Sequence, residues 1–128
     1  MNDDFIKILV IDDTFTNRFL LREVIKKNNF NYFEAENGKE GIELLRKEKP
    51  SLILLDIEMP VMNGFETLDY IRNQMEAPFN TIPIIAITAH NPEIFRDDFK
   101  DYIFDDLLTK PFTMEKIMSL IHKYLPNS

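Results

Sequence analysis

Five short apolar runs, each followed by polar or turn-forming residues, recur along the chain. The run Leu52 to Leu55 is too short for a buried helix and is typical of a strand covered on both faces, as in a parallel sheet. The five runs predict strands over these ranges: Ile6 to Ile11, Asn31 to Ala35, Leu52 to Leu55, Ile82 to Ile87, and Leu107 to Thr109.

The segments between the runs repeat apolar residues at the three- and four-residue spacing of amphipathic helices. The repeating positions are Leu20, Leu21, Val24 and Ile25; Ile42, Leu44 and Leu45; Phe65, Leu68 and Ile71; and Ile117, Leu120 and Ile121. Thr14 or Thr16 can cap the first helix and Thr113 the last, while Asn91-Pro92 predicts the start of a weakly patterned fourth helix. Five strands therefore alternate with five helices.

Such alternation through short connections predicts a doubly wound α/β domain with a parallel sheet. Right-handed crossovers with helices on both faces favour the strand order 2-1-3-4-5 of a flavodoxin-like fold. Neither a repeat nor a linker interrupts the pattern, so residues 1–128 are expected to form a single domain with a core from about residue 5 to residue 125.

The composition of the chain argues against several classes of protein. With 128 residues and 45% hydrophobic content, the chain can build its own core, and the lack of cysteine excludes disulfides, thiol nucleophiles and cysteine-based zinc sites. No apolar run approaches the roughly 20 residues that span a bilayer. The acidic start of the chain argues against a signal peptide, so a cytoplasmic location is expected. The net charge of −7 argues against non-specific nucleic-acid binding.

Polar side chains stand where four of the predicted strands end. Asp12 and Asp13 follow the first strand, Asp56 the third, Thr88 the fourth, and Lys110 the fifth. In the order 2-1-3-4-5 these strands are neighbours about 4.8 Å apart, so three carboxylates, a hydroxyl and an ammonium should share one crevice. Taken singly, each residue could equally cap a turn or lie in solvent.

Clustered carboxylates repel one another, and an oxygen-only site with room for water suits Mg²⁺. The charges of three aspartates, one Mg²⁺ and one lysine sum to zero. Such a site can hold a phosphoryl group by positioning and electrostatics, and an aspartate can itself become phosphorylated.

The chain resembles the receiver domain of two-component response regulators over about Phe5 to Leu125. The resemblance rests on the Asp12-Asp13 pair, on Asp56 followed by Met59-Pro60 and Met62-Asn63-Gly64, on Thr88-Ala89, and on Lys110-Pro111. Carried over residue by residue, it implies that Asp56 is the phosphoacceptor. It also implies that Asp13, Asp56 and the backbone carbonyl of Glu58 bind Mg²⁺ directly, with Asp12 acting through water.

The same resemblance implies that Lys110 pairs with the phosphoryl oxygens and that the Thr88 hydroxyl and the Ala89 amide bind the group once transferred. The Lys110-Pro111 peptide bond is expected to be cis. The implied reaction takes a phosphoryl group from a phosphohistidine of a histidine kinase or a histidine phosphotransfer protein. The new charge then switches a surface that binds a downstream protein target. The domain is thus expected to be a signalling receiver that catalyses its own phosphorylation and dephosphorylation, with no separate enzymatic output and no membrane or nucleic-acid partner.

Several positions depart from the family or stay ambiguous. Leu107 stands where the family often has an aromatic switch residue and is interpreted as a filled core position. Ile103 stands where many receivers have a glycine that ends the fourth helix, so that helix should end differently or fray. The aromatic residues between Phe95 and Phe104 are interpreted mainly as core and loop cover, with a partner surface as the alternative.

Three further groups each keep two interpretations. Glu58, at the mouth of the site, could obstruct attacking water or compete for the metal, or it could point into solvent. His90 and His122 are interpreted as ordinary surface residues, with phosphodonors or ligands as the alternative. Phe15, Phe19 and Arg22 form a helical stripe that either docks a partner's helix or packs against the last helix.

Two other classes of protein compete with a receiver. Asp56-Ile57-Glu58 weakly imitates the signature of a Mg²⁺-dependent aspartyl-phosphate hydrolase, but the nucleophile would be on the third strand instead of the first. A flavin-binding module of the same topology would need a loop rich in Ser, Thr and Gly after the first strand, where this chain has Asp-Asp-Thr-Phe-Thr. The Asp-x-x-Met-Pro and Thr-Ala-His sequences also resemble those in receivers of hybrid kinases. The chain could therefore be a free-standing receiver or a receiver that belongs to a hybrid kinase.

Overall fold

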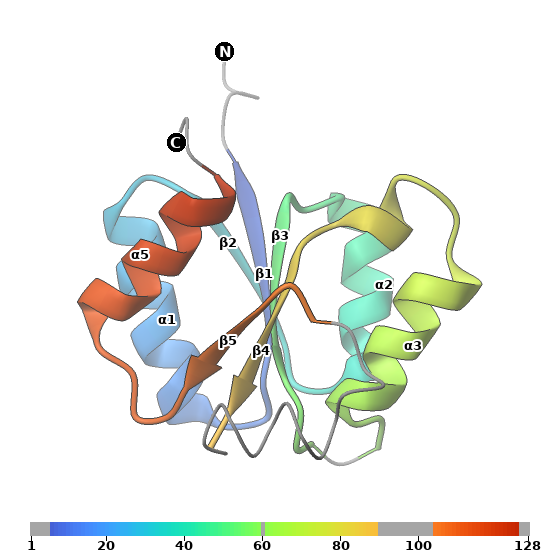
Figure 1. The fold of residues 1–128 in the computed structure, drawn as a ribbon, viewed down its shortest axis with the longest axis horizontal. Helices are drawn as coiled ribbons and strands as arrows, with labels where there is room; N and C mark the ends of the chain where they lie inside the picture. Colours follow the sequence, from blue (N-terminus) through green and yellow to red (C-terminus); the bar gives the residue numbers. More distant parts are fainter. Residues whose placement is uncertain (1–5, 60, 90–103, 126–128) are drawn as a thin grey trace.

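The computed structural model describes residues 6–59, 61–89 and 104–125. Its five strands form one parallel sheet in the order β2-β1-β3-β4-β5, which confirms the predicted topology (Figure 1). The strands are β1 (Lys7–Ile11), β2 (Asn31–Ala35), β3 (Leu52–Asp56), β4 (Ile84–Thr88) and β5 (Asp106–Thr109). β2 has its predicted bounds, and each of the other four strands overlaps its predicted range and differs from it by one or two residues at its ends.

Helices cover both faces of the sheet (Figure 1). The described helices are α1 (Phe15–Lys27), α2 (Gly38–Glu48), α3 (Gly64–Gln74), α5 (Met114–Tyr124) and the short 3-10 helix η2 (Phe79–Thr81). α1 and α5 pack on one face, and α2 and α3 on the other. None of the helices within the described ranges is long and apolar enough to cross a membrane. The predicted fourth helix at Asn91-Pro92, together with Pro60, His90, Phe95, Phe99, Tyr102 and Ile103, lies outside the described residues.

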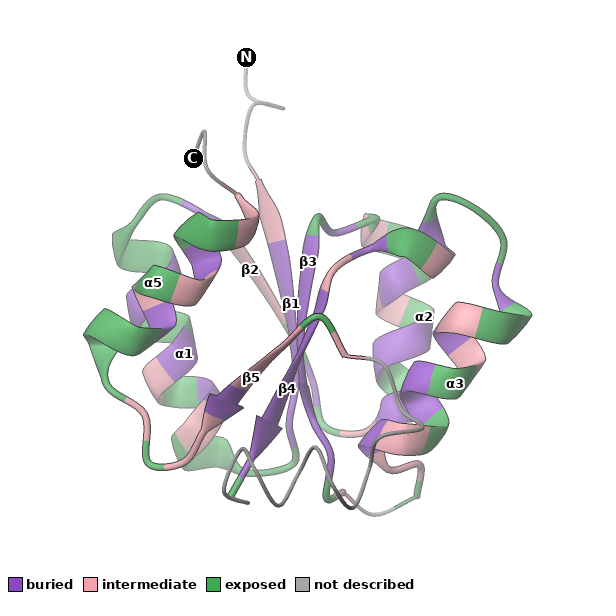
Figure 2. Ribbon diagram, in the orientation of Figure 1, coloured by how far each residue is buried: buried purple, intermediate pink, exposed green. Residues whose placement is uncertain are grey.

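The core consists of two layers, one on each side of the sheet. Successive side chains of a strand point to opposite faces, so Ile8 and Val10 pack under α1 and α5 while Leu9 and Ile11 pack under α2 and α3. Every residue of β3 and β4 is buried (Figure 2), as expected for strands covered on both faces. Each buried aliphatic side chain contributes about 1.5–3 kcal/mol, so this double layer is the main source of stability.

Helix ends agree with the predictions in part. The Thr113 side chain accepts a hydrogen bond from the Lys116 amide and caps α5, as predicted. Thr14, one of the two predicted capping positions, is the N-cap residue of α1, but its side chain makes no capping hydrogen bond. Leu44 and Leu120 are only half-buried, because each lies at the edge of its helix's apolar stripe.

The parallel register fixes which strand ends lie side by side. Ile11 pairs with Leu55, Asp56 with Ile87, and Thr88 with Thr109. The residues that follow these pairs therefore emerge at one edge of the sheet, where open α/β sheets bind their ligands.

Candidate functional site

Three aspartates lie together at the carboxyl ends of β1 and β3. Asp12, Asp13 and Asp56 each offer one carboxylate oxygen, and these three oxygens all lie within 4.8 Å of one another. Asp12 and Asp56 are buried, with 0% and 2% of their surface exposed, whereas Asp13 is exposed. The sequence-based prediction that acids from two separate strands converge is therefore confirmed.

The carboxylate of Asp12 is fixed by the start of α1. The Thr14 amide donates to Asp12 Oδ1 at 2.8 Å, and Asn17 Nδ2 donates to Oδ2 at 3.2 Å. The backbone of Asp12 is also held, because its amide donates to the Ala35 carbonyl of β2 at 3.0 Å. These contacts leave Asp12 with little freedom to turn away from Asp56.

Asp56 is held by the loop that follows it. The Glu58 amide donates to Asp56 Oδ1 at 3.1 Å, and the Gly64 amide donates to the Ile57 carbonyl at 3.1 Å. A Cβ atom at Gly64 would lie 2.4 Å from Ile57 Cα and 2.6 Å from the Asp56 carbonyl oxygen, so only glycine allows α3 to start this close to β3. Asn63 and Glu66 close a capping box at the same helix start.

The electrostatics of the cluster favour bound cations or protons. Burial, together with the negative charge of Asp12, raises the pKa of Asp56 from 3.8 to about 7, although the Glu58 amide and Lys110 oppose this change. Burial also raises the pKa of Asp12, against the Thr14 amide and Lys110. The site is thus short of positive charge, and its oxygen-only donors fit a hard cation such as Mg²⁺.

Lys110 reaches the cluster from the end of β5. Its Nζ lies 3.9 Å from Asp56 Oδ1, and its amide donates to the Thr88 carbonyl at 2.8 Å. The Lys110-Pro111 peptide bond is cis, as predicted. Thr88 is buried at the end of β4, and Ala89 is exposed directly after it. The structure therefore brings Lys110 to Asp56 and ties the turn after β5 to β4.

Two further predicted positions, Glu58 and Leu107, lie near the site and say less about its chemistry. Glu58 is exposed, and its contact with Asp56 is made by the backbone amide. Leu107 is half-buried against Ile57 and Ala86, together with Phe65 and Phe104, which agrees with a filled packing position.

A charged residue that sequence reasoning missed lies directly behind the aspartates. Arg18 of α1 is 7% exposed, and its Nη1 donates to the Asp12 carbonyl oxygen at 2.9 Å. The sequence held a signal for it, because Arg18 precedes Leu21 and Ile25 at the i, i+3, i+7 spacing of the buried face. A basic residue within an apolar stripe indicates a buried cation with a partner.

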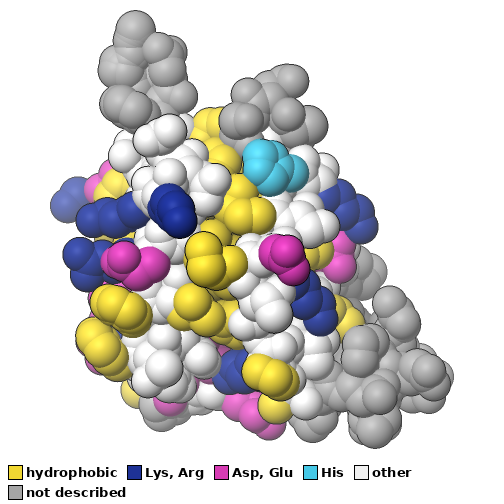
Figure 3. Space-filling model, turned by 90° about the vertical axis from the view of Figure 1, so that its left-hand side faces the viewer, with side chains coloured by type: hydrophobic (Ala, Val, Ile, Leu, Met, Phe, Trp, Pro, Cys, Tyr) yellow, Lys and Arg dark blue, Asp and Glu magenta, His cyan; other side chains and the backbone are white. Residues whose placement is uncertain are grey.

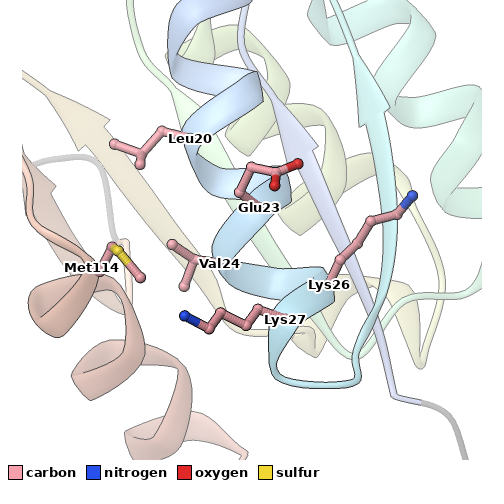
Figure 4. A pocket seen from close by; sticks show the side chains of 6 residues that line it. All are labelled: Leu20, Glu23, Val24, Lys26, Lys27 and Met114. Carbon is pink, nitrogen blue, oxygen red and sulfur yellow. The ribbon is translucent and has the colours of Figure 1, made fainter.

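An apolar surface adjoins the site on α1. Phe15 and Phe19 are 69% and 50% exposed and their rings stack at 6.2 Å, which favours docking of a partner over packing against the last helix and leaves the docking role a prediction. Figure 3 shows hydrophobic side chains gathered on the face that α1 and α5 form. A hollow of about 490 Å³ lies between the two helices (Figure 4), lined by Leu20, Glu23, Val24, Lys26, Lys27 and Met114.

Comparison with known proteins gives the same family by three routes. The family model described as "Response regulator receiver domain" matches residues 8–122. Sporulation initiation phosphotransferase F of Bacillus subtilis is 34% identical over 120 residues, which cover 94% of both chains. Protein PilH of Pseudomonas aeruginosa is 34% identical over 119 residues, which cover 93% of this chain and 97% of PilH.

A solved structure agrees with these relatives. The chemotaxis response regulator CheY4 of Vibrio cholerae superposes with a TM-score of 0.84 at 26% identity, covering 94% of this chain and 98% of CheY4. The strand order, the family match and the relatives point to one conclusion. The chain belongs to the response regulator receiver domain family and has the phosphoacceptor function of that family.

Proposed function

We propose that Asp56 is the phosphoacceptor of this receiver and that Asp12, Asp13 and Lys110 form its reaction site. The observation that supports this most is the approach of Lys110 Nζ to within 3.9 Å of Asp56 Oδ1, at a cluster of three aspartates within 4.8 Å. Within the described residues, the ion pair that Lys110 forms in the cluster is with Asp56. Under this proposal residues 5–125 act as one receiver unit.

The residues that would hold Mg²⁺ are Asp13 and Asp56 directly, together with the backbone carbonyl of Glu58, and Asp12 through water. The fit rests on donor chemistry, since the cluster offers oxygen ligands, and burial together with neighbouring carboxylates raises the pKa of Asp12 and of Asp56. When bound, the cation neutralises charge on the cluster and on the phosphoryl oxygens. Protons compete for the same oxygens, so a site with a raised pKa binds the cation better as the pH rises.

The reaction is a phosphoryl transfer that the domain itself promotes. An oxygen of ionised Asp56 attacks the phosphorus of a partner's phosphohistidine while the P–N bond breaks, and the imidazole leaves with the electron pair and takes up a proton. Lys110 would balance the charge of the phosphoryl oxygens, because its ammonium lies 3.9 Å from Asp56 Oδ1. Hydrolysis of the acyl phosphate by water then returns Asp56 to its starting form.

The Thr88 hydroxyl and the Ala89 amide would bind the phosphoryl oxygens after transfer. Thr88 ends β4, the strand next to β3, and Ala89 follows it directly. The Lys110 amide donates to the Thr88 carbonyl and so ties the end of β5 to the end of β4. Movement of Thr88 toward a doubly charged phosphoryl group would therefore be passed to β5 and to the downstream target's binding surface.

The partner that delivers the phosphoryl group would dock on the surface of α1. Phe15 and Phe19 are exposed on α1, the helix that begins two residues after Asp13, and the hollow between α1 and α5 is lined by residues of the same helix. α1 carries four basic residues and one acidic residue in a chain of net charge −7, so this surface is complementary to an acidic helical partner. A histidine kinase or a histidine phosphotransfer protein is the partner class that the proposed chemistry requires.

The experiment that tests the proposal is incubation with Mg²⁺ and acetyl phosphate, followed by intact-mass measurement of phosphoryl incorporation. We expect one phosphoryl group per chain, its loss in Asp56→Asn, and its retention in the control Asp69→Asn, which changes an exposed aspartate on α3. Incorporation by Asp56→Asn at the wild-type rate would refute the assignment. Release of many equivalents of phosphate without a lasting adduct would favour the hydrolase alternative, and binding of flavin without phosphorylation would favour the flavin module.

A further inference from the structure

Arg18 is buried, and its guanidinium donates a hydrogen bond to the backbone of the acidic cluster at the Asp12 carbonyl. Burying a charge is costly unless it is paired and hydrogen-bonded. Arg18 lies on the buried face of α1, where an aliphatic residue would pack at no electrostatic cost. The contacts of Arg18 should therefore explain why a charged residue occupies this buried position.

Those contacts link the end of β1 to the end of β2. Arg18 Nη1 donates to the Asp12 carbonyl oxygen at 2.9 Å. Its Nε lies 3.4 Å from Glu34 Oε2, and its Nη2 lies 3.9 Å from Glu36 Oε2. The Tyr32 hydroxyl lies 2.8 Å from Glu34 Oε1 and 3.1 Å from the Arg18 carbonyl oxygen, so it fixes the glutamate against the arginine.

The hydrogen bond reaches the peptide unit between the two aspartates. The Asp12 carbonyl belongs to the peptide that joins Asp12 to Asp13, so its direction sets where both carboxylates leave the chain. The Asp12 amide is already held by the Ala35 carbonyl at 3.0 Å. With Arg18 holding the carbonyl, the backbone on both sides of Asp12 is fixed before any cation arrives.

The glutamates keep this arrangement from weakening the site. An unpaired arginine so close to Asp12 would neutralise the cluster that a cation must bind. The two carboxylates of Glu34 and Glu36 offset the charge of Arg18, which leaves its hydrogen bond as its main effect on the aspartates. The planar guanidinium can contact a carbonyl and two carboxylates at once, which a lysine ammonium does less well.

We propose that Arg18 is a positioning residue that holds the Asp12-Asp13 peptide in the geometry required for Mg²⁺ binding. The inference rests on the proposed function, because it takes the three aspartates as the metal ligands. The proposed effect of Arg18 on Mg²⁺ binding comes from the position of the aspartates and not from the charge of the guanidinium. Removing a positive charge beside an acidic site should by electrostatics alone strengthen cation binding, whereas loss of positioning should weaken it.

The test is calorimetric titration of the purified chain with Mg²⁺ and, separately, with Ca²⁺, at a temperature where every variant is folded by circular dichroism. Mg²⁺ demands near-octahedral geometry with ligands at about 2.0–2.1 Å, while Ca²⁺ tolerates irregular and longer coordination. We expect Arg18→Met to weaken Mg²⁺ binding by about tenfold or more and Ca²⁺ binding by only about twofold. The control Arg46→Met, which removes a half-exposed arginine of α2, should leave both affinities unchanged.

Two results would overturn the inference: wild-type or tighter Mg²⁺ binding by Arg18→Met, and equal losses for Mg²⁺ and Ca²⁺. If Arg18→Met does not fold, Arg18→Lys replaces it, because the lysine keeps the charge but loses the planar fork. We then expect about a threefold or greater loss for Mg²⁺ with Ca²⁺ binding retained, and wild-type Mg²⁺ binding by Arg18→Lys would refute the proposal.

Failure of the proposed function has a separate signature. If Asp13→Asn binds Mg²⁺ as tightly as the wild-type chain, the metal binds elsewhere and both proposals lose their basis. Mg²⁺ binding that Asp13→Asn abolishes but Arg18→Met leaves intact would retain the site and reject the role of Arg18 alone.

Discussion

Replacing Asp56 with asparagine should stabilise the metal-free domain at neutral and higher pH. The pKa of Asp56 is raised from 3.8 to about 7, and burial is the largest cause. The native state therefore binds a proton more tightly than the unfolded state, so this residue's contribution to stability falls as the pH rises from about 4 to about 7. Because one pKa unit corresponds to about 1.4 kcal/mol, keeping Asp56 ionised in the fold costs about 4 kcal/mol above pH 7.

Asparagine has roughly the same shape as protonated aspartate and no charge, so it avoids this cost. The attraction of Lys110 at 3.9 Å and the Glu58 hydrogen bond already lower the pKa of Asp56, so the figure of about 4 kcal/mol includes them. The net gain of Asp56→Asn should be about 4 kcal/mol at pH 8 and about 1.6 kcal/mol at pH 5, where Asp56 is ionised in the unfolded state and largely protonated in the native state.

Urea unfolding followed by circular dichroism, in the presence of a chelator at pH 5 and pH 8, measures this difference. The control Asp69→Asn removes an exposed carboxylate of α3 and should change stability by less than about 0.5 kcal/mol at either pH. Adding Mg²⁺ at pH 8 should stabilise the wild type and not Asp56→Asn, which reverses part of the difference. A variant less stable than the wild type at pH 8 without metal would refute the reasoning.

Three further changes follow from the backbone and the contacts around the site. Val61 is 78% exposed and has a φ of 68°, which places a β-branched side chain in the left-handed region. Val61→Gly should therefore raise the free energy of unfolding by about 1 kcal/mol. An unchanged free energy of unfolding in urea would contradict this. Gly64→Ala places a methyl group against the backbone of Asp56 and Ile57, so we expect a loss of about 2–3 kcal/mol and slower phosphorylation by acetyl phosphate. Arg72 Nη1 donates to the Asn80 and Ile82 carbonyls and its Nη2 pairs with Asp105 at 2.8 Å, so Arg72→Met should cost about 2–4 kcal/mol in the same assay. Retention of wild-type stability by either of these last two variants would contradict the contacts described here.

The sheet and the convergence of the site could be predicted because both follow from periodicity. Runs such as Leu52 to Leu55 are buried on both faces, and a parallel sheet places the carboxyl ends of its strands at one edge. Asp12, Asp56 and Lys110 could therefore be brought together from their positions alone. Their approach is now observed, whereas their roles in phosphoryl transfer stay predictions.

The features that sequence reasoning missed depend on tertiary contacts. The spacing places Arg18 on the buried face of α1, but the partners that allow its burial, which include the Asp12 carbonyl and Glu34, lie at the ends of other elements. The positive φ of Val61 arises from the tight path between β3 and α3, which no local preference of valine favours. The spacing of Phe15 and Phe19 fits both alternatives for their stripe, because it does not determine what an aromatic stripe packs against.

The most direct test of the account is a crystal structure of the chain with Mg²⁺ and a beryllium fluoride analogue of the phosphoryl group. We expect the beryllium on a carboxylate oxygen of Asp56, with Lys110 Nζ and the Thr88 hydroxyl on its fluorides, and the metal held by Asp13 and Asp56. An analogue bound to Asp12 or Asp13, or a Lys110 that contacts neither Asp56 nor the analogue, would contradict the account.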